Sequence, residues 1–108
     1  MSSWDVQSLS ERFLRLADQT ERRAEECRQR VPRSSGHKWF HDEALAEFSV
    51  YHRLHGRTFL ETPQALVSEL HSMKKLKLTT GAYDPEVFER RRLQTIDDLL
   101  AEFEPQLT

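Results

Sequence analysis

The sequence predicts an all-α protein of four helices joined by short loops, packed either as a helical bundle or as an open helical array. Apolar residues recur at steps of three and four in four separate segments, which is the spacing of an amphipathic helix. Loops of about five residues separate these segments and favour antiparallel neighbours. No segment shows the pattern of a β-hairpin. A chain of 108 residues is long enough for one domain, so we expect a single helical domain over residues 1–108.

The first helix is expected from about Ser8 to Val31, with a start as early as Ser3 also considered. Ser8 and Glu11 form a capping-box pattern at its start, and Pro32 ends it. Its apolar stripe is narrow, like the seam of a coiled coil, and such a seam can pack against a second copy of itself. A content of 37% hydrophobic and 31% charged residues is also lean for the core of a monomer. We therefore expect a homodimer, with an interface formed by Leu9, Phe13, Leu16 and Thr20.

The second helix is expected over residues 37–55, with Gly56 directly after its end. His41 and His52 lie about 16 Å apart along the helix axis, so one metal ion cannot bind both. Each of the two closer histidine pairs on this face lacks a third ligand in the sequence. We therefore expect half-buried packing residues and no metal site. The histidines that share this face, which is centred on Phe48, are His37, His41, His52 and His55.

The second helix is also apolar on two faces. Phe40 and Tyr51 lie on one face, whereas Trp39 and Val50 lie on the opposite side. Such a helix either occupies the centre of the domain or turns one face to another chain. Aromatic residues are frequent at protein interfaces and favour the second arrangement.

The third and fourth helices begin with the same signal, an N-cap residue followed by proline. Thr62-Pro63 starts the third helix, which is expected to continue to about Leu78 and to be closed by residues 79–81. Asp84-Pro85 starts the fourth helix, which is expected to continue to Pro105.

The sequence contains no glycine-rich phosphate loop, no GxSxG motif and no CxxC motif, and we expect neither catalytic residues nor cofactors. The single cysteine, Cys27, is expected to be a buried, inert thiol, which fits a reducing compartment. A net charge of −2 argues against the basic surface that DNA binding requires. The N-terminus lacks a signal peptide and no apolar run can span a membrane, so we expect a cytoplasmic protein.

These observations favour a small non-enzymatic module that regulates another protein by occupying its surface. A bacterial antagonist of a transcription regulator and an antitoxin-like inhibitor are examples of this class. Phe59 and Leu60 lie in a connection, where side chains are normally polar, although either of them could pack near Leu66 instead. The expected anchors for the partner are Trp39, Phe40, Tyr51, Phe59 and Leu60.

Two other classes of function stay open. Residues 74–77 (KKLK) and the arginines at 90–92 could form a modest basic patch on a helical DNA-binding transcription regulator. The connection after the second helix is longer than the tight turn of a helix-turn-helix motif, which argues against this class. The other class is a small helical enzyme or a metal protein with ligands at His37 and His41.

Overall fold

The computed structural model describes residues 4–77 and 81–107, which form four α-helices and three short 3-10 turns. The helices are α1 (Val6–Arg30), α2 (Gly36–Leu54), α3 (Pro63–Lys74) and α4 (Pro85–Phe103). The turns are η1 (Val31–Arg33), η2 (Arg57–Leu60) and η3 (Glu104–Leu107). The predicted all-α fold with four packed helices is therefore confirmed.

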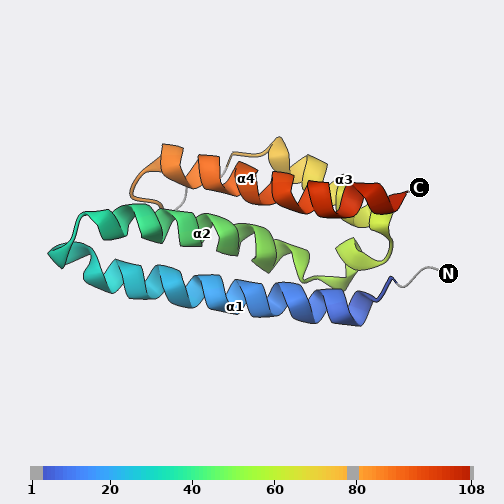
Figure 1. Cartoon of the computed structure of the whole chain (residues 1–108), viewed down its shortest axis with the longest axis horizontal. Coiled ribbons are helices and arrows are strands. Elements are labelled where there is room, and N and C mark those ends of the chain that lie inside the picture. Colours follow the sequence, from blue (N-terminus) through green and yellow to red (C-terminus); the bar gives the residue numbers. More distant parts are fainter. Residues whose placement is uncertain (1–3, 78–80, 108) are drawn as a thin grey trace.

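The three long helices lie side by side in one layer, with α2 between α1 and α4 (Figure 1). The molecule is elongated, with extents of 53 × 25 × 18 Å. The short α3 packs against α4 at the end of the layer where α1 begins and α4 ends (Figure 1). We call this end the closed end, and the opposite end, formed by residues 28–40 and the adjoining parts of α1, α2 and α4, the tip. Of the two arrangements expected for a helix that is apolar on two faces, the structure shows the central one.

The large apolar side chains gather at the closed end, where all four helices and η2 contribute to one core. Trp4 covers this core from outside: its ring lies 5.8 Å from that of Phe103, and its indole N–H donates a hydrogen bond of 2.7 Å to the carbonyl oxygen of Leu60. The buried members of the core are Phe13, Val50, Leu54, Leu60, Leu66, Val67, Leu70, Met73, Ile96, Leu99, Leu100 and Phe103.

The apolar stripe of α1 faces α2 and the core of its own chain. Phe13 and Thr20 are buried, while Leu9 and Leu16 are half-buried against the core. The Thr20 hydroxyl donates to the carbonyl oxygen of Leu16 at 2.8 Å, so this polar group is satisfied within its own helix. Packing within one chain accounts for the periodicity, and Phe13 and Thr20 present no surface to a second copy. The homodimer itself stays a prediction.

The helix starts at Thr62 and Asp84 are confirmed, because each side chain accepts hydrogen bonds from the backbone of the first turn. α1 begins at Val6, between the two starts considered, but the capping role predicted for Ser8 was wrong. Asp5 is the N-cap of α1, and its carboxylate accepts a hydrogen bond of 3.1 Å from the Ser8 N–H. The third helix ends at Lys74 rather than at Leu78, which lies outside the described residues together with Thr79 and Thr80.

Arg92 explains the early end of α3. Its side chain is buried, and its guanidinium donates to the carbonyl oxygens of Met73, at 2.8 Å, and Leu76. Glu89, one turn earlier on α4, neutralises its charge at 2.7 Å. The guanidinium thus satisfies carbonyl groups that the end of a helix leaves without partners. From the sequence, Arg92 was considered only as part of a modest basic patch, so this buried role was missed.

Candidate protein-binding face

The tip is packed with small side chains. The apolar residues buried there, apart from the main core, are Ala24, Ala44 and Ala46, with Val87 and Phe88 from α4. Alanines let the helix backbones approach closely, but they bury little apolar surface. Two large apolar side chains at this end, Trp39 and Phe40, remain outside the contacts between helices.

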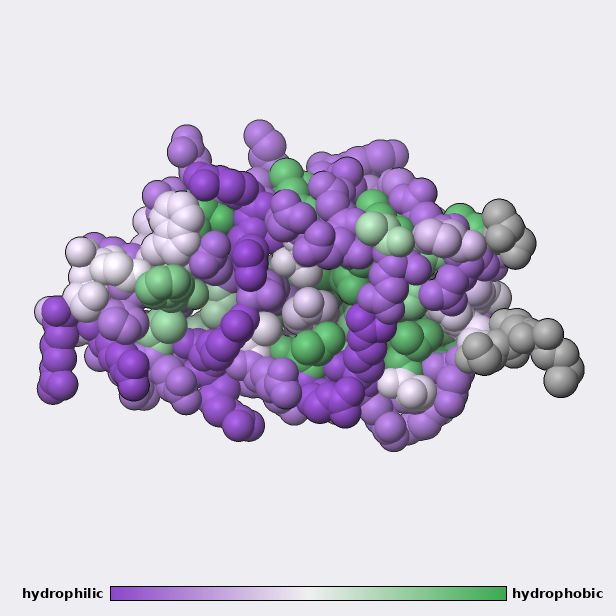
Figure 2. Space-filling model, viewed as in Figure 1, coloured by the Kyte–Doolittle hydropathy of each residue, from purple (hydrophilic) through white to green (hydrophobic). Residues whose placement is uncertain are grey.

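A groove follows the contact between α1 and α2 on one broad face of the layer. It consists of two hollows, of about 280 and 370 Å³, which share Arg23, Glu26 and Glu47 in their lining. The hollow nearer the tip is also lined by Cys27, His37 and Phe40, and the other by Leu16, Thr20 and Tyr51. Figure 2 shows apolar side chains in the hollows of a mainly hydrophilic face.

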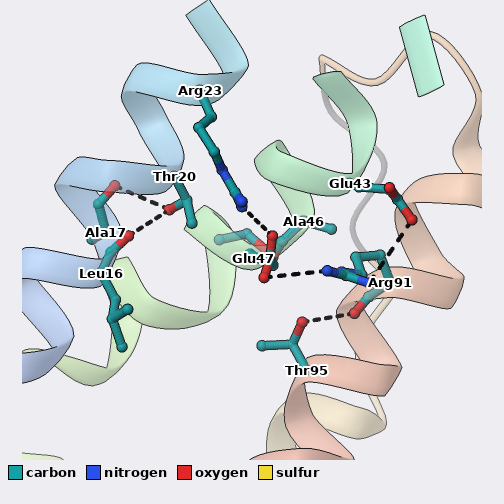
Figure 3. Close-up of polar contacts among 10 residues, drawn as sticks. Leu16, Ala17, Thr20, Arg23, Glu43, Ala46, Glu47, Arg91 and Thr95 are labelled. Atoms are coloured by element: carbon teal, nitrogen blue, oxygen red, sulfur yellow. Dashed lines mark hydrogen bonds and ion pairs between the residues drawn. The ribbon is translucent and has the colours of Figure 1, made fainter. Parts of the chain in front are cut away.

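Glu47, on α2, joins all three long helices across this face (Figure 3). Its carboxylate forms an ion pair with Arg23 of α1 and lies 3.5 Å from the guanidinium of Arg91 of α4. Arg91 also lies 3.9 Å from Glu43. Only 16% of the Glu47 side chain is exposed, so water screens this carboxylate less than it screens the outer ends of the arginines. One acidic side chain of the central helix therefore holds a basic side chain from each outer helix.

Two large aromatic side chains are exposed beside this network. Trp39 is 44% exposed and Phe40 is 57% exposed, on adjacent positions near the start of α2. The guanidinium of Arg90 lies over the Trp39 ring at 5.4 Å, and the His37 ring meets Phe40 edge-on at 6.4 Å. A hollow of about 180 Å³ between α2 and α4 is lined by Trp39 and Arg90. The tip thus presents two rings, each next to a depression between helices.

The five predicted anchors do not form one surface. Phe40 and Tyr51 both line the groove, but they are about 16 Å apart along α2. Tyr51 is half-buried and stacks against Phe13, with 6.3 Å between ring centroids, and burial is the main reason why its pKa is raised. Phe59 lies in η2, under the guanidinium of Arg53 at 5.3 Å.

Leu60 is completely buried in the core of the closed end, so this predicted anchor has no surface to offer a partner. The alternative considered from the sequence, packing near the start of the third helix, describes its position better. The surface that remains around Trp39 and Phe40 includes features that were not expected from the sequence. These are the half-buried Cys27 in the groove, Arg90 over Trp39, and a third exposed ring, Tyr83.

The histidines are distributed among different environments. His41 is buried, with Nδ1 2.9 Å from the carboxylate of Asp42, and its ring contacts that of Tyr83 at 4.8 Å. His52 and His55 lie 5.3 Å apart between ring centroids. In residues 4–77 and 81–107, no three histidine, cysteine or acidic side chains come together in a way that could hold a metal ion.

Asp42 is the most buried acidic side chain at the tip and was overlooked in the sequence. Its carboxylate accepts hydrogen bonds from the backbone N–H groups of Tyr83, at 2.9 Å, and Asp84, at 2.6 Å. These contacts attach the chain that enters α4 to the middle of α2. Asp42 is therefore a structural residue that fixes the start of α4.

Comparison with known proteins gives no further guide, because no family model, curated protein or solved structure matches this chain. Among the described helices, none is both long and apolar enough to cross a membrane.

Proposed function

We propose that this protein is a non-enzymatic module that regulates another protein by binding to its surface, and that Trp39 and Phe40 are the anchors. The observation that carries the proposal is the exposure of these two adjacent rings, 44% and 57%, on the central helix. Aromatic side chains that enter a pocket on a partner contribute a large share of the binding energy at many interfaces.

The surroundings of the two rings support this role. α2 is held from both sides through Glu47, so the rings are presented by a well-packed helix and little conformational freedom is lost on binding. The hollows beside Phe40 and Trp39 offer space for side chains of the partner. Charged groups such as Arg30 and Arg90 surround the rings, as is common at the rim of an interface.

The test compares the wild-type protein with Phe40→Ser and Trp39→Ser. Each protein is used as bait in extract of the native cells, and the proteins that the wild type retains are purified for direct binding measurements with the wild type and with every variant. Both variants should keep the free energy of unfolding within about 1 kcal/mol, because exposed side chains add little to stability. Both should weaken binding by about 30-fold or more.

Leu14→Ser is the matched control, because Leu14 is an equally exposed apolar side chain on α1 that does not line the groove. It should bind like the wild type. Tyr51→Ala and Phe59→Ala complete the series, and Tyr51→Ala should lower stability because its ring packs on Phe13. If Leu14→Ser loses the partner while the Phe40 and Trp39 variants retain it, the binding surface lies elsewhere and the proposal is wrong.

A further inference from the structure

Charge is distributed unevenly along the long axis of the molecule. At the tip, the segment of residues 28–40 contains four basic residues and no carboxylate: Arg28, Arg30, Arg33 and Lys38. Residues 97–107, at the end of α4 and in η3, contain four carboxylates and no lysine or arginine: Asp97, Asp98, Glu102 and Glu104. The two segments lie at opposite ends of the molecule (Figure 1).

Most of the positive charge at the tip is not neutralised within the chain. Arg28 pairs with Glu25 at 2.7 Å. Lys38 lies over the ring of Tyr83 at 5.9 Å, which leaves its charge in place. Arg30 and Arg33 form no ion pair with any residue in the described ranges.

The acidic segment is only partly neutralised. Lys74 pairs with Asp97 at 2.8 Å and Arg12 pairs with Glu102 at 2.5 Å, while His71 lies 3.6 Å from Glu104. Two full positive charges, those of Lys74 and Arg12, thus face four carboxylates, and these carboxylates remain accessible to solvent. An excess of negative charge is left at this end of the molecule.

We propose that two copies of this protein pair in an antiparallel manner, with the tip of each copy against residues 97–107 of the other. A parallel pair would place like charges together. A head-to-tail arrangement would leave one tip unpaired and would continue into an open chain, whereas an antiparallel pair with a two-fold axis closes. In a molecule 53 Å long the two contacts are well separated, and formation of one favours the other by raising its effective concentration.

The pairing should be weak and sensitive to salt, because it rests on exposed charges. In sedimentation equilibrium at low ionic strength, the wild-type protein at micromolar concentration should approach twice its mass of 12.8 kDa. Raising sodium chloride from about 0.05 M to about 0.5 M should increase the dissociation constant at least tenfold, because the Debye length falls about threefold. Trp39 and Phe40 belong to the same tip, so a second copy and a partner protein would compete for this surface. The pairing rests on the charges and the proposed function on the two rings, so different variants test them.

Two charge-reversal variants test which surfaces meet. The tip variant carries Arg30→Glu, Arg33→Glu and Lys38→Glu, and the end variant carries Asp98→Lys and Glu104→Lys. Each variant alone should sediment mainly as a monomer, with a dissociation constant for self-association at least tenfold higher than that of the wild type. An equimolar mixture should recover the mass of a dimer, because the reversed tip of one variant then faces the reversed end of the other.

A control variant with Arg15→Glu, Arg22→Glu and Lys75→Glu changes the net charge as much as the tip variant does, at exposed positions outside residues 28–40. It should dimerise like the wild type. The proposal is overturned by a wild type that stays monomeric at low salt, by open polymers, or by variants that dimerise unchanged. A monomer that binds a DNA oligonucleotide or polyglutamate through its tip would also overturn it and would assign the tip to a polyanion.

Discussion

The two ends of this molecule are built from the same helices but are held together by different forces. At the closed end, large apolar side chains from α1, α2, α3 and α4 interdigitate, and the aromatic rings of Phe13 and Phe103 are inside. At the tip, α1, α2 and α4 meet through three alanines together with Val87 and Phe88, and ion pairs through Glu47 cross the surface. The rings of Trp39 and Phe40 are outside.

The position of α3 accounts for this difference. A layer of three helices has two broad faces, and α3 covers part of one face at the closed end only. Where the fourth helix is present, large side chains find partners on all sides. Where it is absent, small residues join the helices and the remaining large rings face solvent. The closed end therefore contains the main apolar core, and the tip leaves the rings of Trp39 and Phe40 exposed.

The largest expected effect separates the two ends directly. Phe13→Ala should lower the free energy of unfolding by about 3–5 kcal/mol, because it leaves a cavity in the core. Phe40→Ala should lower it by less than about 1 kcal/mol, because that ring is mostly exposed. Urea unfolding monitored by circular dichroism measures both. Equal losses in the two variants would mean that aromatic rings at the tip contribute as much to the free energy of unfolding as those in the core of the closed end.

The tip nevertheless contains one side chain on which its own fold depends. Asp42→Ala should lower the free energy of unfolding by about 2–4 kcal/mol, because the N–H groups of Tyr83 and Asp84 lose their acceptor. Asp42→Asn should cost less, since one oxygen remains to accept. Asp98→Ala, which removes an exposed carboxylate of α4, is the control and should change stability by less than about 1 kcal/mol. If Asp42→Ala lost as little free energy of unfolding as Asp98→Ala, Asp42 would not have the structural role assigned to it.

The sequence was informative where local signals decide the structure. The helix starts at Thr62-Pro63 and Asp84-Pro85 depend on adjacent residues and were predicted correctly. At the start of α1, Asp5 and Ser8 are both good N-caps, and the sequence pattern favoured the wrong one.

Features set by distant partners were not predictable from the sequence. The end of α3 depends on Arg92, which comes from α4 and reaches back across 16 residues to Leu76. Likewise, the apolar stripe of α1 has the same spacing whether it faces a second copy or α2. Two of the predicted anchors, Trp39 and Phe40, are exposed, whereas the burial of Leu60 depends on how the connection folds back onto the core.

The ion pairs at the tip should matter less than its buried carboxylate. Glu47→Gln should lower the free energy of unfolding by about 1 kcal/mol, because it removes the charge that holds Arg23 and Arg91. The difference from the wild type should shrink in high salt. Glu69→Gln is a matched control at the closed end, because Glu69 is buried to a similar extent but faces a single arginine, Arg53. It should lose about half as much free energy of unfolding as Glu47→Gln. A larger loss in Glu69→Gln would contradict the view that charge contributes more at the tip.

The smallest expected effect concerns the ion pair between Arg12 and Glu102, which lies beside the apolar core of the closed end. Two hydrogen bonds of 2.5 and 2.6 Å from Arg12 hold the pKa of Glu102 below its ordinary value, against the opposing effect of burial. Since the pKa is lower in the folded state, this carboxylate stabilises the fold above its pKa in the unfolded chain, about 4.3. The contribution is lost as the pH falls through the folded pKa. Both side chains are partly exposed, so the contribution should stay below about 1 kcal/mol.

Glu102→Gln should therefore be slightly less stable than the wild type at pH 7, and the difference should disappear once the pH has fallen below the folded pKa of Glu102, where this group is protonated in both states. Arg12→Gln should behave differently. The Arg12 guanidinium also lies over the rings of Phe13 and Phe103, at 5.5 and 5.6 Å, so part of its contribution does not depend on the charge of Glu102. Thermal unfolding of the three proteins at a series of pH values separates the two parts. If the loss in Arg12→Gln disappears at low pH as completely as that in Glu102→Gln, the contact with the rings adds nothing, and the pair is purely electrostatic even beside the apolar core.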